Sequence, residues 1–97
     1  MFRLSERDKK FTIINGPPVW DPLETVFDEN VDIIKNFMYM GTVRLYNGHF
    51  VYLYKNELNK KYINIDKNGN TFAYDGNNYK KISQDIAKKY VLSSTWK

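Results

Sequence analysis

The alternation of apolar and polar residues on either side of Asn47-Gly48 limits what this chain can fold into more than any other feature. Residues 42–46 and 49–54 both repeat with a period of two, the period of a β-strand that has one buried face. Asn-Gly is the pair that a two-residue type I′ turn favours, because both residues tolerate a positive φ. The sequence therefore predicts a β-hairpin with a two-residue turn.

The register of this hairpin decides which side chains reach the core. A two-residue turn pairs Tyr46 with His49 and Leu45 with Phe50. We expect the more apolar face to be buried, and it collects Val43, Leu45, Phe50, Tyr52 and Tyr54. The opposite face collects Thr42, Arg44, Tyr46, His49, Val51 and Leu53.

The chain after this hairpin predicts two more strands and a short helix. Residues 61–65 alternate, residues 66–70 have the composition of a turn, and residues 71–74 form a fourth strand. Ser83 is a suitable N-cap for a helix over residues 84–91. The side chains that we expect to face inward from this helix are Ile86, Ala87 and Tyr90.

The first forty residues predict one short strand and one long helix. Residues 11–14 are a strand candidate that ends at Asn15-Gly16-Pro17-Pro18. Three start signals for a helix follow: Asp21 as N-cap, Pro22 at the first helical position and Glu24 at the third. Apolar residues then recur every three or four positions as far as Met40, before Gly41. They are Leu23, Val26, Phe27, Val31, Ile34, Phe37 and Met38.

Together these elements predict a single α+β domain over residues 1–97. We expect a four-stranded, mostly antiparallel meander packed by one long N-terminal helix, from Pro22 to Met40, and one short C-terminal helix. Apolar residues make up 42% of the chain, enough for one core. No apolar run approaches the roughly 18 residues of a membrane span, and the N-terminus lacks a signal-peptide core. With no cysteine in the chain, we expect a cytoplasmic protein without a membrane partner.

Residue types that carry catalysis or bind cofactors are scarce. One histidine and no cysteine exclude Cys-His pairs and histidine-rich metal clusters, and the five glycines stand singly rather than in a phosphate-binding loop. Residues 66–70 resemble the start of a calcium loop. However, the sixth position of that loop is Thr71 instead of glycine, and the twelfth is Asn77 instead of glutamate. We therefore expect a non-enzymatic protein with no cofactor and no metal site.

Positive charge is concentrated in the second part of the chain. Residues 1–40 carry five Lys/Arg and seven Asp/Glu, whereas residues 41–97 carry ten Lys/Arg and four Asp/Glu, a net charge of +6. Seven of the eight tyrosines lie in the same part. Cations interleaved with aromatic rings suit phosphate contacts and base stacking. Lysine is also a common solubilising residue and tyrosine is common in half-buried strands, so a purely structural interpretation stays open.

One stretch in the last third of the chain resembles a known family. In residues 72–87 a strand leads through an aromatic-x-Gly-x-x-Tyr turn into a serine-capped helix, and a tryptophan follows near the end. This pattern is similar to that of RAMA-type modules, which are found beside restriction enzymes and adenine methylases. The resemblance implies an accessory role in association with nucleic acid and no catalysis. The matching positions are Tyr74, Gly76, Tyr79, Ser83, Ala87 and Trp96.

Two functional hypotheses follow. The first is a module that contacts nucleic acid, with cations on phosphate and an aromatic ring on a base. The second is a phage or mobile-element inhibitor or adaptor that binds a host protein, because Tyr and Trp are common at protein interface hot spots. Lysine is depleted at such interfaces, which favours the first. Its predicted site residues are Arg44, Tyr46, Lys60, Lys61, Lys80, Lys81, Lys88, Lys89 and Trp96.

Overall fold

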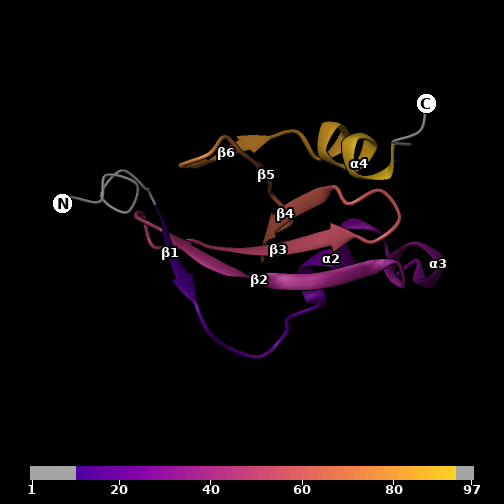
Figure 1. Ribbon diagram of the computed structural model, residues 1–97, viewed down its shortest axis with the longest axis horizontal. Helices are drawn as coiled ribbons and strands as arrows, with labels where there is room; N and C mark the ends of the chain where they lie inside the picture. The colour runs from indigo at the N-terminus through magenta and orange to yellow at the C-terminus, as the bar shows by residue number, and fades with distance from the viewer. Residues whose placement is uncertain (1–10, 94–97) are drawn as a thin grey trace.

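The computed structural model describes residues 11–93, and their dominant element is one antiparallel sheet of six strands in the order β1-β2-β3-β4-β5-β6 (Figure 1). The predicted four-stranded meander is therefore wrong. The strands are β1 (Phe11–Ile14), β2 (Phe37–Leu45), β3 (Phe50–Asn56), β4 (Tyr62–Asp66), β5 (Thr71–Tyr74) and β6 (Tyr79–Ile82). The helices are α2 (Asp21–Val26), α3 (Val31–Ile34) and α4 (Gln84–Leu92).

The predicted long helix from Pro22 to Met40 is also wrong. Asp28 and Glu29 have φ values of 52° and 58°, which lie outside the right-handed helical region and end the first helix. Asn30 then caps α3, because its Oδ1 accepts a hydrogen bond from the backbone N–H of Asp32 at 3.0 Å. From Phe37 onward the chain is extended and belongs to β2.

The start of α2 differs from the prediction by one residue. The N-cap is Trp20 rather than Asp21, and its side chain makes no capping hydrogen bond. Asp21 and Glu24 lie in the first turn, where their negative charge suits the helix dipole. The acidic residues therefore stabilise the start of α2 through their charge and not through a side-chain cap.

Four residues of the predicted apolar stripe lie in the main core, although they come from several elements, whereas Val31 and Met38 are exposed. Leu23 and Val26 of α2 are buried together with Phe27, and Phe37 reaches the same cluster from β2. The ring centres of Phe27 and Phe37 are 5.6 Å apart. Burial of each aliphatic side chain stabilises the fold by about 1.5–3 kcal/mol. The remaining members are Tyr54, Ile63, Ile65, Ala87 and Val91.

The hairpin between β2 and β3 has a three-residue loop rather than a two-residue turn. Leu45 N–H donates to the His49 carbonyl at 2.8 Å, and Gly48, with a φ of 92°, completes the loop. Phe50 therefore pairs with Arg44 and not, as predicted from a two-residue turn, with Leu45. Because the register shifts by one residue, Val51 instead of Phe50 joins Val43 and Leu45 in the core.

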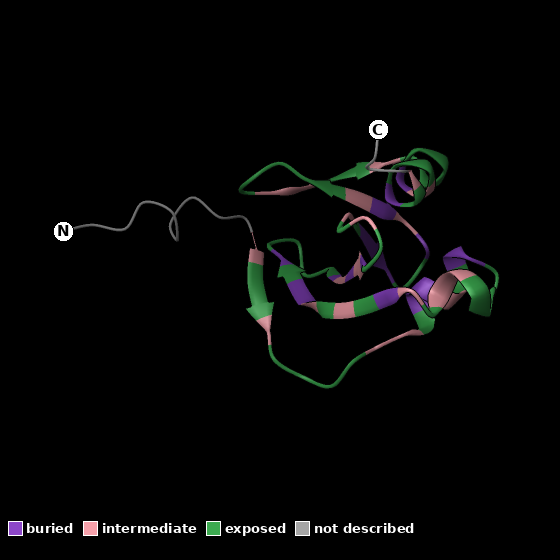
Figure 2. Cartoon of the chain, turned by 45° about the vertical axis from the view of Figure 1, so that its right-hand side comes forward, coloured by how far each residue is buried: buried purple, intermediate pink, exposed green. Residues whose placement is uncertain are grey.

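The sheet curls so that its two ends approach each other. Phe11 of β1 lies with its ring centre 5.1 Å from that of Tyr79 in β6 and 5.8 Å from that of Tyr74 in β5, both in edge-on geometry. The concave side holds a second cluster around Val43, Leu45 and Val51. Figure 2 marks buried residues along several strands of the sheet and on α4, whereas β1 has none.

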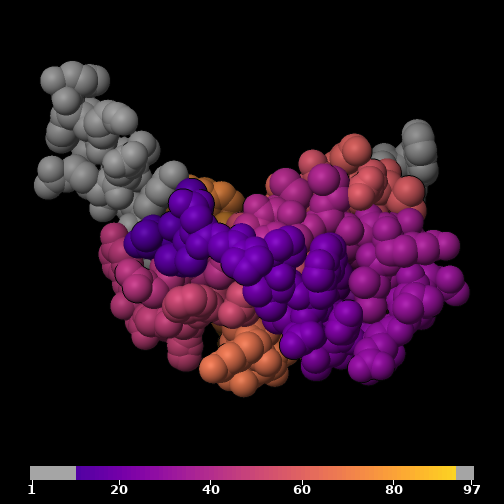
Figure 3. Space-filling view, turned by 90° about the horizontal axis from the view of Figure 1, so that it is seen from below, coloured from indigo at the N-terminus to yellow at the C-terminus, as the bar shows by residue number. Residues whose placement is uncertain are grey.

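The segment between β1 and α2 runs across one side of the molecule (Figure 3). Tyr54 of β3 anchors it, because its hydroxyl donates to the Val19 carbonyl at 2.6 Å. Burial raises the pKa of Tyr54 well above its ordinary value, so this hydroxyl stays protonated.

The C-terminal helix begins where it was predicted. Ser83 is its N-cap, with Oγ accepting from the backbone N–H of Ile86 at 3.1 Å. Of the three residues expected to face inward, Ala87 is buried, whereas Ile86 and Tyr90 are 60% and 54% exposed. The buried side of α4 is instead formed by Ala87 and Val91.

None of the helices within residues 11–93 has the length and hydropathy of a membrane-spanning helix.

Candidate functional site

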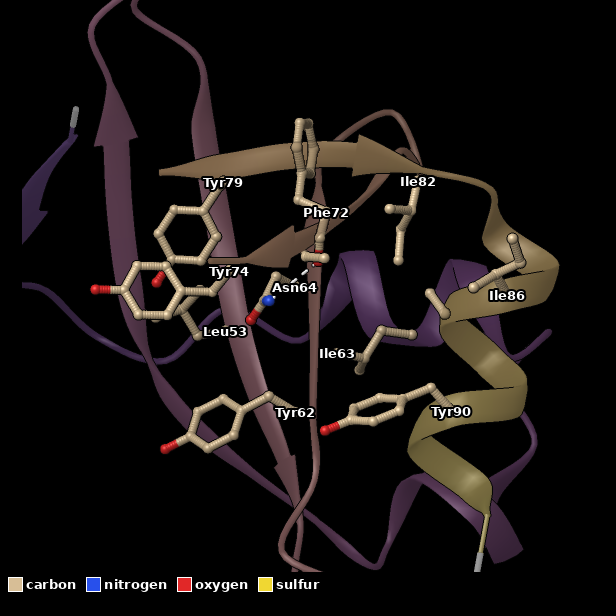
Figure 4. Close-up of a pocket in the computed structure, with 12 residues that line it drawn as sticks. Leu53, Tyr62, Ile63, Asn64, Phe72, Tyr74, Tyr79, Ile82, Ile86 and Tyr90 are labelled. Carbon is tan, nitrogen blue, oxygen red and sulfur yellow. Dashed lines mark hydrogen bonds between the residues drawn. The ribbon is translucent and has the colours of Figure 1, made fainter. Parts of the chain in front are cut away.

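An aromatic groove lies on the concave side of the sheet. It has a volume of about 690 Å³ and lies between β3 and β4, the β5–β6 hairpin and α4 (Figure 4). Its lining comes from five elements that span forty residues of sequence. These residues are Leu53, Tyr62, Ile63, Asn64, Phe72, Ala73, Tyr74, Tyr79, Ile82, Ile86, Ala87 and Tyr90.

Four tyrosines supply most of the ring surface of this groove. Tyr74 and Tyr79 stack on each other, with ring centres 4.8 Å apart and an interplanar angle of 29°. Tyr62 of β4 and Tyr90 of α4 are both exposed, so solvent reaches their rings from the groove. Burial, together with the neighbouring Tyr74 and Tyr62, raises the pKa of Tyr79 to about 12. At neutral pH the Tyr79 ring is therefore uncharged and does not repel an anion.

The position of α4 explains why apolar side chains stand open to solvent here. The helix is held to the sheet by Ala87 and Val91, so Ile86 and Tyr90, four residues apart, share its groove-facing side. At its C-terminal end, Asn59 Nδ2 donates to the carbonyl oxygens of Val91 at 2.8 Å and Ser93 at 2.7 Å. The wall that Ile86 and Tyr90 form is thus anchored at the C-terminal end of α4.

One buried polar side chain lies among these apolar residues. Asn64 of β4 is only 5% exposed, and its Nδ2 donates to the Phe72 carbonyl at 3.1 Å across the β4–β5 pair. Figure 4 shows its carboxamide between the tyrosines of the hairpin and the ring of Tyr62.

Two predicted cations stand beside the groove. Lys61 Nζ lies 4.9 Å from the centre of the Tyr90 ring and donates to Ser93 Oγ at 2.6 Å. Lys81 pairs with Phe72 in the β5–β6 register, and partners in an antiparallel pair share one face of the sheet. Both cations therefore border aromatic side chains of the groove.

The other predicted site residues do not line this groove. Lys80 lies 3.5 Å from Asp75 as an ion pair, and Lys88 Nζ lies 5.6 Å from the ring centre of Phe27. Lys60 and Lys89 are exposed beyond the groove lining. Arg44 and Tyr46 are exposed on β2 and its loop, also outside the lining, and Trp96 lies outside the described residues.

Sequence reasoning missed the residues that line the groove most extensively. Tyr62, Tyr74, Tyr79 and Tyr90 belong to the cluster of seven tyrosines after Gly41, which was the available signal. Only Tyr46 was selected from that cluster. Asn64 carried no signal, because the sequence of an alternating strand does not show whether an asparagine faces solvent or a groove. The curl of the sheet decides between the two.

A second hollow of about 540 Å³ lies between the β2–β3 loop and the β4–β5 turn and contains His49 and Asp66. The Asp66 carboxylate accepts from the backbone N–H groups of Asn68 and Asn70 and from the Asn70 side chain, all at 2.9–3.0 Å. These bonds make residues 66–70 a turn, as predicted. Across residues 11–93, no three His, Asp or Glu side chains gather as metal ligands would.

No protein-family model, curated protein or solved structure matches this chain. The resemblance of residues 72–87 to RAMA-type modules therefore stays a prediction. The groove itself supplies the observations on which function can be argued.

Proposed function

We propose that this protein is a non-enzymatic, cytoplasmic module that binds single-stranded nucleic acid in its aromatic groove. The observation that carries the proposal is that exposed tyrosine rings from separate elements line one hollow and that lysines stand at its border. Tyr62 and Tyr90 offer ring surface from β4 and α4, and Lys61 stands against Tyr90. Bases stack on such rings whatever their sequence, while lysines contact the phosphates.

The dimensions of the groove favour a single strand over a duplex. In a duplex each base is covered above and below by its neighbours, so its faces are closed to protein side chains. The rings of Tyr62 and Tyr90 lie in a hollow of about 690 Å³, which has room for individual unstacked bases. A duplex would meet only the lysines at the border.

The charge of the surroundings supports an anionic partner. Residues 41–97 have a net charge of +6. Asp75, which lies in the β5–β6 turn beside the groove, is paired with Lys80. Hydrogen bonds from the backbone N–H groups of Asn77 and Asn78 lower the pKa of Asp75, and Lys80 lowers it further. The negative charge of Asp75 is therefore balanced by Lys80 within the hairpin.

Fluorescence anisotropy with labelled ten-nucleotide DNA and RNA strands at low salt tests the proposal. Changing Tyr62 or Tyr90 to Ala should weaken binding about five- to 100-fold, since stacking contributes about 1–3 kcal/mol per base. Tyr46→Ala is the matched control, because Tyr46 is 69% exposed but lies outside the groove. We expect this variant to bind as the parent does, and a hairpin duplex to bind more weakly than either strand.

Absence of any salt-dependent binding by the parent to DNA or RNA strands would overturn the proposal. Equal losses from Tyr46→Ala and Tyr90→Ala would also contradict it, because the groove would then have no special role. The alternative hypothesis, an inhibitor of a host protein, would in either case become the one to test through exposed Ile86.

A further inference from the structure

Asn64 presents a hydrogen-bond acceptor at the floor of the groove. Its Nδ2 is engaged, since it donates to the Phe72 carbonyl at 3.1 Å. Its Oδ1 accepts no hydrogen bond from any of residues 11–93. Within the same residues no fully buried polar side-chain atom lacks a partner, so this oxygen is open to the hollow rather than sealed beneath it.

The bond to Phe72 decides which end of the carboxamide faces the hollow. With Nδ2 held by the backbone of β5, the oxygen points to the space between Tyr62 and the β5–β6 hairpin (Figure 4). The side chain is 95% buried, and its neighbours Leu53 and Phe72 are apolar. Polar groups that are this deeply buried are normally paired, because leaving one unpaired costs stability.

Packing alone does not account for an asparagine at this position. Residues 63 and 65, on either side of it in β4, are isoleucines, and an aliphatic residue would fill the floor without any unpaired oxygen. The hydrogen bond to the Phe72 carbonyl accounts for the amide nitrogen of Asn64 but not for its oxygen. An acceptor ringed by aromatic side chains is instead the arrangement that small-molecule and base sites use to orient a flat, mostly apolar ligand.

We propose that Asn64 Oδ1 accepts a hydrogen bond from the exocyclic amino group of a base that enters the groove. This inference rests on the proposed binding of single-stranded nucleic acid and adds a preference to it. Adenine, cytosine and guanine each carry an amino group with two N–H donors. Thymine and uracil offer a single ring N–H between two carbonyl oxygens, and those oxygens repel Asn64 Oδ1. The groove therefore prefers an amino-bearing base to thymine or uracil.

Ligand substitution tests this preference on the unaltered protein. The probes are labelled strands of ten thymidines in which one central base is replaced by adenine, by cytosine or by purine, which is adenine without its amino group. We expect adenine and cytosine to bind about three- to tenfold more tightly than thymine or purine, the range of one hydrogen bond. Equal affinity of the adenine and purine strands would overturn the inference.

The variant Asn64→Val then assigns the preference to this residue. Valine has the β-branched shape that strands favour and removes the acceptor, so we expect the adenine and purine strands to bind this variant with equal affinity. Asn77→Val, in the exposed β5–β6 turn, is the control and should retain the preference. If the preference survives in Asn64→Val, the role given to Asn64 is wrong.

The two levels of the proposal fail in different ways. A parent protein that binds every strand equally contradicts only the base preference, whereas one that binds no strand contradicts the proposed function itself. Should Asn64→Val fail to fold, which thermal melting would reveal, the adenine and purine strands on the parent still decide the question.

Discussion

The Asn56 side chain donates from Nδ2 to the carbonyl oxygen of Val91 at 2.9 Å, and this buried hydrogen bond joins the end of β3 to the last turn of α4. The two residues are 35 positions apart. The last carbonyls of a helix have no partner within the helix, so a side-chain donor from elsewhere satisfies one of them. The bond therefore fixes the end of the helix that forms one wall of the groove.

Replacing Asn56 with Ala should lower the free energy of unfolding by about 1 kcal/mol, because the Val91 carbonyl loses one of its two side-chain donors and keeps the other, Asn59 Nδ2. Urea denaturation measures the change. Asn77→Ala is the control, since Asn77 is exposed in the β5–β6 turn. Equal stability of Asn56→Ala and the parent would mean that α4 does not depend on this contact.

Glu29→Gly distinguishes the observed helix break from a continuous helix. Glu29 has a φ of 58°, and glycine adopts this conformation without the steric cost of a side chain. We expect the variant to match the parent or to gain up to about 1 kcal/mol of stability. In a continuous helix the same change would cost about 1 kcal/mol. A loss comparable with that of Glu24→Gly, a control within α2, would contradict the break.

Gly48→Ala should destabilise the protein by about 1–2 kcal/mol through backbone strain. The φ of Gly48 is 92°, and an added Cβ would meet no atom within 4 Å, so crowding does not contribute. Gly16→Ala is the matched control, because that site is equally open and its φ is not positive. Thermal melting of both variants tests this, and similar melting temperatures would contradict the positive φ of Gly48.

Stability should decline above about pH 10. The pKa of Tyr79 is raised to about 12 by burial, whereas in the unfolded chain tyrosine ionises near 10. Folding therefore retains its full contribution from Tyr79 below pH 10 and loses it as the pH rises towards 12. Urea denaturation between pH 8 and 12 measures the decline. Tyr79→Phe should reduce this decline in stability. An unchanged decline in the variant would show that another titrating group is responsible.

Lysines at the border of the groove should determine the salt dependence of strand binding. Lys61→Gln and Lys81→Gln should each reduce the slope of log affinity against log salt by about 0.7, the value for one contact to a single strand. Lys35→Gln is the control, since Lys35 lies at the end of α3 and outside the groove lining. An equal reduction from Lys35→Gln would point to general attraction instead of contacts at the groove.

Local structure was largely predictable from neighbouring residues. Residues 11–14 and 71–74 form strands with the predicted bounds, and Ser83 caps the predicted helix. Each of these depends on interactions within a few positions: alternation, a turn, or a side chain that bonds a nearby N–H. Leu23, Val26, Phe27 and Phe37 of the apolar stripe are buried as expected, whereas Val31 is exposed. The three- and four-residue spacing of the stripe could not distinguish one helix from two helices and a strand.

The sequence by itself determined the positive charge after Gly41, the strands at residues 11–14 and 71–74 and the helix that Ser83 caps, because these depend on residue type and near neighbours. Only the tertiary structure decided the rest. One residue of register moved Val51 into the core, and the curl of the sheet brought Tyr62, Tyr74 and Tyr90 around Asn64. Such contacts join residues far apart in the chain, and their geometry follows from packing that no local pattern encodes.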